Sequence, residues 1–436
     1  MATSPASKNT KRTARTPAKK TASKRTDSRT TKRSSSAKRS TAKRPAKRVA
    51  KASTRSSAKS SGTKRTARAP AKKAASKRVA PSSANRSSNA NSSTAQRSAK
   101  RQPASTVYGE NELREDYLLD FKVLIAKNRV KRPQEFASTT AYPKERADDP
   151  FLPGNEHMAS PEIGRVGSES SWQIRWFENR YPLFNPDGKR DAPKYNPLLQ
   201  SEPAVGFHEI IVGTPVKNRQ FWDFTPKQIE ALLHVYHSEV DRLQDKGYKF
   251  VQIFKNHGPN AGTSIVHEHT QIVALPFVPP RIEEEISAAA RYFRSRRRCA
   301  YCDVIKEERQ TKERVAYENE AFIVICPYAS RYNFEAHLYP KIHKSSFREL
   351  LPKDYEGLAD AMAYVLKRLK KLKLNFNVEF HYEPMSKAYK EKNSGLHFHV
   401  EILPRRQIWG GFELGTSIIV NEVSPEMAAA YYQTGR

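Results

Sequence analysis

One loop-and-strand segment of the chain holds the residues best suited to chemistry. It ends in an HxHxQ unit formed by His267, Glu268, His269, Thr270 and Gln271. In an extended segment alternate side chains share one face, so His267, His269 and Gln271 would converge on one ligand. The Gly/Pro/Asn-rich run before the unit contains Gly262 and Ser264 and predicts a loop. Such a loop could hold a phosphate against a nucleophilic histidine.

The elements that would position this unit occur twice in the body of the chain. In the first half, apolar patterns predict strands at residues 171–179, 207–212 and 250–254 and a helix at 225–245. In the second half the same order returns, with strands at 322–325, 334–339 and 378–382 and a helix at 353–372. The last predicted strand of the second half surrounds His397 and His399, with Glu401 in place of the glutamine. We therefore expect two α+β units, each ending in an HxH strand.

The first 105 residues need a separate explanation. They contain 31 lysine and arginine residues against one acid, Asp27, and so carry +30 of the formal net charge of +33. The first aromatic residue is Tyr108, so this tail has almost nothing to bury and is expected to be disordered. A polycation attracts DNA or RNA by releasing counterions, without sequence preference. The alternative is a solvated arm that keeps an enzyme soluble.

Cysteine content and hydropathy narrow the class of protein. The chain has three cysteines, two of them in Cys299-Ala-Tyr-Cys302, which argues against a disulfide scaffold and fits a reducing cytoplasm. No apolar run of about 18 residues occurs, so no membrane span is predicted. We expect a cytoplasmic protein, with nucleoid association if the tail binds DNA.

Several ordered motifs make the chain resemble a known family. They are Arg129-Val130-Lys131-Arg132-Pro133, Pro153-Gly154-Asn155-Glu156, the run from Asn256 to Gln271, and Gly411-Phe412-Glu413 followed by Asn421. In this order they resemble the galactose-1-phosphate uridylyltransferase branch of the histidine-triad superfamily, over roughly residues 115–433. The resemblance implies two tandem histidine-triad-like domains with antiparallel sheets and packed helices, a catalytic one at residues 106–290 and a zinc-binding one at 291–436.

The resemblance also implies a reaction. Family members attack the α-phosphorus of a sugar nucleotide with a histidine and pass the nucleotidyl group to a second sugar 1-phosphate. The matching nucleophile is His269, whose neutral imidazole suits attack and later departure. Gln271 would donate its amide to the non-bridging phosphate oxygens, and Ser264 and Gly262 would cradle the β-phosphate. Glutamine at this position is typical of the transferases, whereas the hydrolases carry a third histidine there.

Further positions match substrate contacts of the family. They are Arg129, Arg132, Asn179, Asn256, His267, Gln407, Phe412 and Glu413. The segment matching Gln407 to Glu413 reaches across a dimer in the family, so a homodimer is expected. The implied partners are a sugar nucleotide and hexose 1-phosphate.

A metal site is expected in the second half. Cys299, Cys302, His343 and His397 fall at the family's ligand positions and form a Cys2His2 set, which suits a structural zinc with no open coordination position. His337 is the reserve ligand. In the first half, the cysteines of a CPFCPGNE-like run are replaced by Asp149 and Leu152, and Lys217 stands where relatives have histidine. We therefore predict one zinc per chain, which frees His267 to bind phosphate or brace its strand.

Two alternatives remain open at this point. Glu268 replaces the family's proline between the histidines and could perturb the pKa of the nucleophile, although a structural role fits its outward direction. The histidines could also simply alternate on half-buried strands. Gln271, Gly262, Ser264 and the paired arginines favour catalysis for His269, but nothing comparable supports His399.

These observations give two hypotheses of function. The first is a nucleotidyltransferase acting on hexose 1-phosphate, with uridylyl transfer first and adenylyl transfer, or phosphorolysis of an ADP-sugar or dinucleotide, next. The second is a nucleic-acid-associated protein whose body binds nucleotides with reduced activity. The basic tail motivates the second hypothesis.

Overall fold

The computed structural model describes residues 111–127, 129, 148–187, 198–199, 201–384, 389 and 395–436. The basic tail at residues 1–105 and the candidate residue Arg132 lie outside the described residues. Among the helices that are described, none is both long and apolar enough to cross a membrane.

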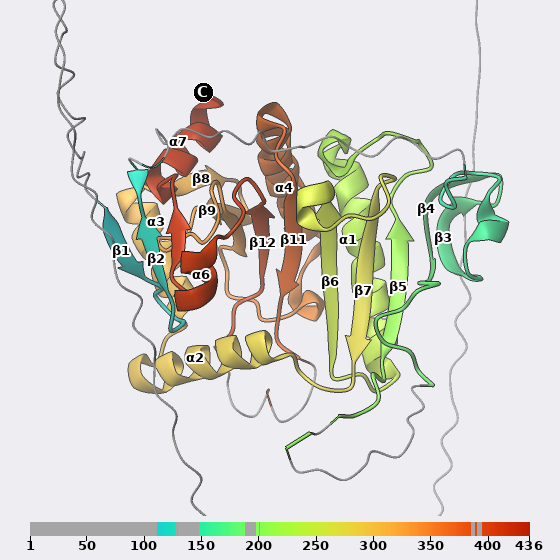
Figure 1. The fold of residues 1–436 in the computed structure, drawn as a ribbon, viewed down its shortest axis with the longest axis horizontal. Helices are drawn as coiled ribbons and strands as arrows, with labels where there is room; N and C mark the ends of the chain where they lie inside the picture. The colour runs from blue at the N-terminus through green and yellow to red at the C-terminus, as the bar shows by residue number, and fades with distance from the viewer. Residues whose placement is uncertain are drawn as a thin grey trace, which may run out of the picture. The chain divides into compact units, whose positions relative to one another are not determined.

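A ten-stranded sheet forms the centre of the body (Figure 1). Its strand order is β3-β4-β5-β7-β6-β11-β12-β10-β9-β8, and all neighbouring strands are antiparallel. The first half contributes β3 (Glu162–Ser168), β4 (Ser171–Glu178), β5 (Phe207–Val212), β6 (Phe250–His257) and β7 (His269–Leu275). The second half contributes β8 (Val315–Glu318), β9 (Phe322–Ile325), β10 (Ala336–Pro340), β11 (Phe376–His381) and β12 (His399–Pro404).

The order of the strands confirms the internal duplication. Reading outward from the centre, β6, β7, β5 and β4 match β11, β12, β10 and β9. The two halves meet where β6 pairs with β11, with Phe376 opposite His257 and Glu379 opposite Phe254. The predicted boundary between residues 290 and 291 falls inside helix α2 (Pro280–Arg296), which runs across the lower end of the sheet in Figure 1.

Two long helices cover one face of the sheet. They are α1 (Pro226–Asp245) and α4 (Pro352–Leu372), and they pack against each other as well as against strands. Thr225 caps α1 by accepting a hydrogen bond from the backbone N–H of Gln228, and both helices begin with proline, which suits a first helical position. Their apolar faces and the inner sides of both sets of strands form one continuous core. The predicted α+β class is therefore confirmed.

Smaller elements complete the body. β1 (Glu112–Glu115), β2 (Lys122–Ile125) and β13 (Ile419–Asn421) form a separate three-stranded sheet, in which β2 and β13 run parallel. Further helices within the described residues are α3 (Ala300–Thr311), α6 (Gly411–Thr416) and α7 (Pro425–Thr434), with short 3-10 turns η2 (Glu156–Met158), η3 (Phe221–Asp223), η4 (Pro259–Ala261) and η5 (Phe347–Glu349).

Candidate active site

The loop between β6 and β7 is shaped by two glycines and held from the second half. Gly258 and Gly262 both have φ of +84°, a region that favours glycine. A Cβ on Gly258 would lie 2.4 Å from the side chain of Asn375, whose Oδ1 also accepts the backbone N–H of Asn260 at 2.9 Å. Asn377 Nδ2 donates to Asn256 Oδ1 at 2.8 Å and to the Ala261 carbonyl at 2.9 Å. Strand β11 and the residue before it therefore fix the loop of the first half.

His269 is held in the state that a nucleophile needs. It begins β7, and its Nδ1 donates to the carbonyl of His267 at 2.8 Å. That bond places the ring hydrogen on Nδ1 and leaves the lone pair on Nε2. Burial lowers the pKa of His269 to about 4, and the nearby charge of Lys255 acts in the same direction. The imidazole is therefore neutral at pH 7.

His267 braces the strand. It lies just before β7, and its Nδ1 donates to Asp149 Oδ2 at 2.8 Å while its Nε2 donates to the Thr214 carbonyl at 2.8 Å. Burial opposes protonation, but the hydrogen bond and charge of Asp149 raise the pKa of His267 above its usual value. Of the two roles expected from the sequence, phosphate binding and bracing, this geometry fits bracing, since both ring nitrogens are engaged.

Gln271 is oriented by a histidine that the sequence analysis did not single out. His208 on β5 accepts the backbone N–H of Leu183 at its Nδ1, 3.0 Å away, so its hydrogen is on Nε2. That Nε2 donates to Gln271 Oε1 at 3.1 Å, and burial lowers the pKa of His208, which keeps it neutral. With its oxygen occupied, Gln271 presents its amide N–H groups, as an oxyanion contact requires.

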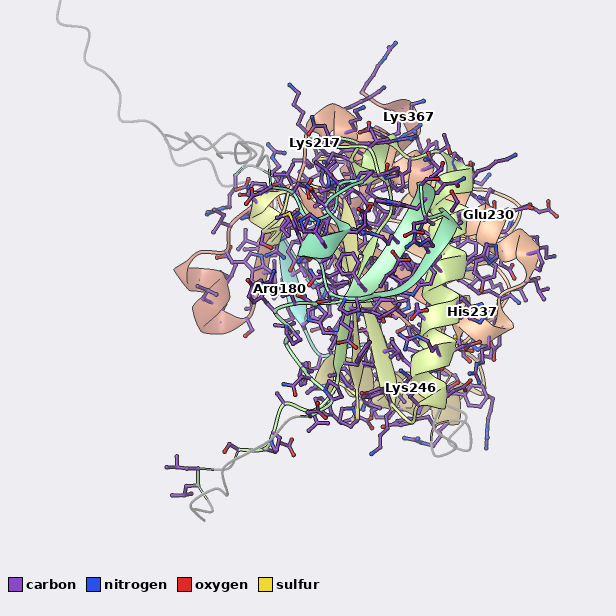
Figure 2. All side chains as sticks on the ribbon, turned by 90° about the vertical axis from the view of Figure 1, so that its right-hand side faces the viewer. Arg180, Lys217, Glu230, His237, Lys246 and Lys367 are labelled. Atoms are coloured by element: carbon purple, nitrogen blue, oxygen red, sulfur yellow. The ribbon has the colours of Figure 1, made fainter. Side chains whose placement is uncertain are left out.

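A cavity of about 340 Å³ lies beside His267. Its apolar wall includes Phe151, Phe177 and Ile210, and the predicted residues Asn179, Ser264 and His267 also line it. Arg180 and Lys217, on the face seen in Figure 2, add positive charge to its rim. A smaller cavity of about 10 Å³ shares Ile265, Val266 and His267 with it and is also lined by His269 and Asn256. Asp148 and Asp149 line the larger cavity, so its polar groups carry both signs. An apolar cavity with a few polar groups close to a nucleophile suits a nucleotide.

Four predicted substrate contacts lie elsewhere in the same chain. Neither cavity next to the HxHxQ unit is lined by Arg129, Gln407, Phe412 or Glu413. Arg129 Nε lies 3.8 Å from Glu422 Oε1. Glu413 Oε2 accepts the backbone N–H of Gly410, just before α6. Within one chain, these residues do not meet the nucleophile.

The four predicted metal ligands do converge. Cys302 Sγ lies 3.6 Å from His343 Nδ1 and 3.5 Å from His397 Nδ1, and Cys299 Sγ lies 3.8 Å from the same His397 atom. Two ligands of a tetrahedral zinc bound through sulfur and nitrogen are about 3.6 Å apart. The hydrogen bond from Cys299, and then those from the imidazoles, lower the pKa of Cys302 to about 3 against the opposing effect of burial, which favours the form that binds metal. The donor set therefore fits a structural metal ion.

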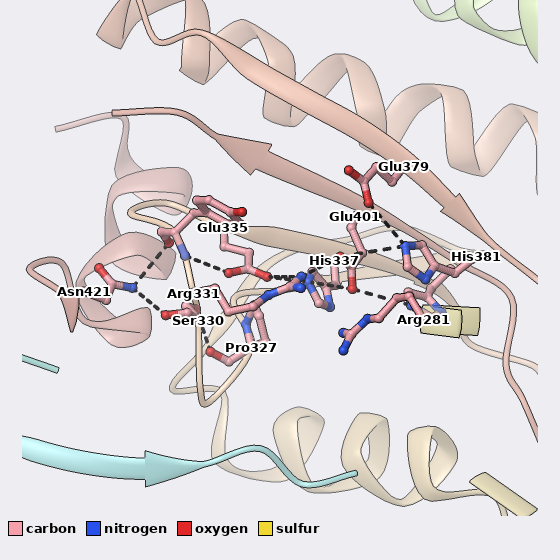
Figure 3. A network of polar contacts seen from close by, with 12 residues as sticks. Arg281, Pro327, Ser330, Arg331, Glu335, His337, Glu379, His381, Glu401 and Asn421 are labelled. Carbon is pink, nitrogen blue, oxygen red and sulfur yellow. Dashed lines mark hydrogen bonds and ion pairs between the residues drawn. The ribbon is translucent and has the colours of Figure 1, made fainter. Parts of the chain in front are cut away.

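The position of the second half that matches the active site is filled by a charge network. His399 Nδ1 donates to the His397 carbonyl at 2.8 Å, as in the first half. Around it, Arg331 pairs with Glu401 at 2.6 Å and with Glu335 at 3.1 Å, and His337 bonds Glu335 at 2.9 Å (Figure 3). The reserve metal ligand His337 is thus part of this network. The cavity here is only about 20 Å³.

Comparisons with known proteins agree with this arrangement. The family model described as galactose-1-phosphate uridyl transferase, N-terminal domain, matches residues 98–279, and one described as a domain of unknown function (DUF4921) matches residues 214–431. The ADP-glucose phosphorylase of Arabidopsis thaliana is 31% identical over 327 residues, which are 73% of this chain and 91% of that protein. The chain belongs to the galactose-1-phosphate uridylyltransferase family.

Further relatives support the same family. The galactose-1-phosphate uridylyltransferase of Thermotoga maritima is 33% identical over 285 residues, 61% of this chain and 86% of that protein. A crystal structure of the Arabidopsis thaliana ADP-glucose phosphorylase with bound ADP-glucose aligns with a TM-score of 0.64 at 28% identity, covering 74% of this chain and 99% of the other. Membership of the uridylyltransferase family makes this chain a nucleotidyltransferase of the histidine-triad superfamily.

Sequence reasoning missed residues that support the family's motif from neighbouring strands. These are His208, which orients Gln271; Asn375 and Asn377, which hold the loop; and Lys255, which pairs with Glu268. The available signal was a polar residue inside an apolar strand, as in Phe207-His208-Glu209-Ile210 and Ile253-Phe254-Lys255. That signal marks a buried polar residue but does not identify its partner.

Proposed function

We propose that this chain moves a nucleoside monophosphate between a sugar nucleotide and a sugar 1-phosphate through a covalent adduct on His269. The uridylyl reaction, from UDP-glucose to hexose 1-phosphate, is the first candidate. The observation that carries the proposal is a buried, neutral His269 whose Nδ1 donates to the His267 carbonyl, while His267 lines a cavity of nucleotide size. Family membership supports the same reaction class.

The reaction balances with two displacements at phosphorus. The lone pair of His269 Nε2 forms an N–P bond with the α-phosphorus, and the bond to the oxygen bridging the α- and β-phosphorus atoms breaks, which releases sugar 1-phosphate. A phosphate oxygen of the acceptor then attacks the same phosphorus, and the N–P bond breaks. Gln271, with its oxygen held by His208, stabilises the charge that builds on the non-bridging oxygens.

A second candidate is transfer of an adenylyl group from an ADP-sugar to inorganic phosphate. It is favoured by the Arabidopsis thaliana ADP-glucose phosphorylase, which is similar over most of its length and was solved with bound ADP-glucose. The two candidates share His269 and the same covalent step. They differ only in base and acceptor.

One experiment tests both candidates. The protein is mixed separately with UDP-glucose, ADP-glucose and a dinucleotide, and the intact mass is measured before and after acid and alkali. A phosphoramidate on His269 should be lost in acid and stable in alkali, and the donor that labels fastest identifies the base. Release of the label by galactose 1-phosphate or by inorganic phosphate identifies the acceptor. If none of the donors labels the protein, the proposal fails.

We also propose one structural zinc ion per chain, held by Cys299, Cys302, His343 and His397. Two sulfur and two nitrogen donors at tetrahedral spacing support zinc over the harder cations. A bound zinc would tie α3 to the loops before α4 and β12. Elemental analysis of the purified protein should give a zinc-to-chain ratio of one.

A homodimer that completes the site is a further part of the proposal. The segment from Gln407 to Glu413 and its neighbours expose apolar side chains, with Ile408 85%, Phe412 50% and Leu414 73% exposed. Such a patch suits burial against a second copy. Mixing an inactive His269→Asn chain with an inactive variant of Gln407 to Glu413 should restore transfer if each site draws on both chains, whereas no recovery in a proven mixed dimer would contradict it.

The basic tail is proposed to bind nucleic acid independently of the enzyme body and so to place a cytoplasmic enzyme on the nucleoid. Its charge of +30 within 105 residues supports this proposal. Removing residues 1–105 should abolish salt-sensitive DNA binding and leave nucleotidylation unchanged. Unchanged DNA binding after truncation would contradict it.

A further inference from the structure

A buried ion pair contacts the main chain of the nucleophile, His269. Lys255 on β6 pairs with Glu268, and the two side chains are only 4% and 2% exposed. The Lys255 ammonium also donates to the main-chain carbonyl of His269 at 2.7 Å and lies 4.7 Å from the centre of the Phe221 ring. Glu268 Oε2 accepts the backbone N–H of Gly213 at 2.9 Å. Both charges are therefore paired and hydrogen-bonded.

The pair joins three strands at the end where the reaction takes place. Lys255 belongs to β6, Gly213 directly follows β5, and Glu268 directly precedes β7. A Cβ on Gly213 would lie 2.4 Å from Glu268 Oε2, so the glycine leaves room for the carboxylate. The backbone pairing between β6 and β7 ends at Phe254 and Gln271. Past that point, the side chain of Lys255 links the two strands by bonding Glu268 and the carbonyl of His269.

General stability does not account for this arrangement. A buried ion pair often contributes no more to folding than apolar residues of the same size, because both charges must be desolvated. Here one of the three ammonium hydrogens is directed at the backbone of His269 itself. The location, one residue from the nucleophile, indicates a role in the reaction.

We propose that Lys255 and Glu268 are positioning residues for His269. The Lys255 ammonium hydrogen-bonds to the main-chain carbonyl of His269. The Glu268 carboxylate accepts the backbone N–H of Gly213 and neutralises the charge of Lys255. The imidazole gains positive charge when it attacks phosphorus. An ion pair with no net charge can hold the ring in the attacking orientation without favouring its protonated form before the attack. This inference rests on the proposed role of His269.

Each member of the ion pair shifts the pKa of His269 in a definite direction. Lys255 lowers the pKa of His269, whereas Glu268 raises it, so each charge offsets the other. Other titratable groups also face this region. They are His257 from β6, His208 from β5, Tyr236 from α1, His267 with its partner Asp149, and Asp223 from η3. Of these side chains, Lys255 is the one that hydrogen-bonds to the backbone of the nucleophile, and Glu268 acts on it through Lys255 and Gly213.

The test uses Lys255→Met, Glu268→Gln and the double variant in the full-length chain. Lys255→Met leaves the anion beside His269, so the pKa of His269, measured by NMR titration of its imidazole, should rise by about one unit. Glu268→Gln keeps the hydrogen-bonding shape but leaves the cation, so this pKa should not rise. The double variant removes both charges and should return the pKa close to the wild-type value. Each variant should nucleotidylate itself about ten to one hundred times more slowly than wild type, because the ring is less well aligned.

Glu209→Gln is the matched control. Glu209 is a buried acid on β5 in the same half, opposite Ile272 of β7, and it contacts Arg242 at 2.6 Å. Burial and the charge of Glu239 raise the pKa of Glu209 to about 9, so the change to glutamine removes little charge. This variant should change neither the labelling rate of the folded protein nor the pKa of His269. If Glu268→Gln and the double variant, when folded, label at the wild-type rate, the positioning role is wrong. It is also wrong if Glu209→Gln slows labelling as much as they do.

Failure of this inference and failure of the proposed function give different results. A wild-type protein that none of the donors labels would overturn the proposed function, while the NMR titration of His269 would still measure the effect of the pair. A wild-type protein that is labelled, with variants that match it in rate and pKa, would overturn only the inference. If Lys255→Met does not fold, Glu268→Gln and the double variant decide the result.

Discussion

The two halves of the sheet carry the same histidine geometry but different surroundings. In each, the second histidine of the HxH unit donates from Nδ1 to the carbonyl of the first at 2.8 Å. In each, Nε2 of the first histidine donates to a backbone carbonyl, of Thr214 at 2.8 Å in one half and of Pro340 at 2.9 Å in the other. The position of a histidine on a strand is therefore not what makes it a nucleophile.

The difference lies in what faces each pair of histidines. In the first half Gln271 and a cavity of about 340 Å³ face the site, and Asp149 binds the first histidine. In the second half Glu401 and ionic partners leave about 20 Å³, and cysteine thiols face the first histidine. Duplication thus produced one half with open space and no cysteine ligands, and another with a metal-ligand set and a closed interior.

The largest expected effect comes from replacing the second histidine of each HxH unit, His269 or His399, with asparagine. His269→Asn should abolish covalent labelling by UDP-glucose or ADP-glucose, because the amide cannot form the adduct. His399→Asn should still be labelled, since that ring has no cavity for a nucleotide beside it. Intact-mass measurement with circular dichroism as a folding control checks both. The comparison would be contradicted if His269→Asn were labelled. It would also be contradicted if His399→Asn folded but were not labelled.

Making the first half resemble the second gives the next largest effect. Gln271→Glu should slow labelling about a hundred- to a thousandfold, because a carboxylate repels phosphate and removes an amide donor. The reciprocal Glu401→Gln leaves Arg331 without one of its partners and should lower stability with little change in the labelling rate of folded protein. Equal rate losses in the two variants would mean that the second half takes part in the chemistry.

Metal removal should affect the second half selectively. Cys302→Ser should lose bound zinc and about 3 kcal/mol or more of the free energy of unfolding, as expected for loss of a structural metal. Asp149→Asn, at the position of the first half that matches Cys299, should leave the zinc content unchanged. Elemental analysis and thermal unfolding measure both. A zinc content that falls in Asp149→Asn would show that the first half also holds metal.

The smallest expected effect is a nearly flat pH dependence. Because the pKa of His269 is lowered to about 4, its nucleophilic form is already complete near pH 6 and is lost only as the pH falls through about 4. The labelling rate of the enzyme should therefore change little between pH 6 and 8. Rapid-quench labelling across this range checks it. A rate that falls steeply below pH 7, as for free imidazole, would contradict the buried, neutral state.

Local patterns predicted most of the elements that carry the site. β5 and β9 coincide with their predicted strands, and α1 and α4 begin within a residue of the predicted start, because apolar periodicity and proline or cap residues are local signals. His267 was expected inside the strand with His269, but the strand begins only at His269. The turn before it follows from contacts with Asp149 and Thr214, which are distant in sequence.

Contacts between distant segments account for what the sequence could not indicate. The pairing of β6 with β11, the amide contacts of Asn377 and the partner of Lys255 all join residues separated by long stretches of chain or by a loop. The family's motifs identified His269 and the metal ligands but not the closed interior around His399. Whether the second half is open depends on Arg331 and its carboxylates, whose packing no local pattern encodes.

The antiparallel pairing of β6 with β11 limits how the protein can be divided. Cutting the chain within α2 would expose a bare strand edge on each fragment, and unpaired edges invite aggregation or re-pairing with another chain. The catalytic loop would also lose Asn375 and Asn377. Fragments should therefore contain both β6 and β11, and a circular permutant should be opened next to β3 or next to β8, the two outer strands of the sheet.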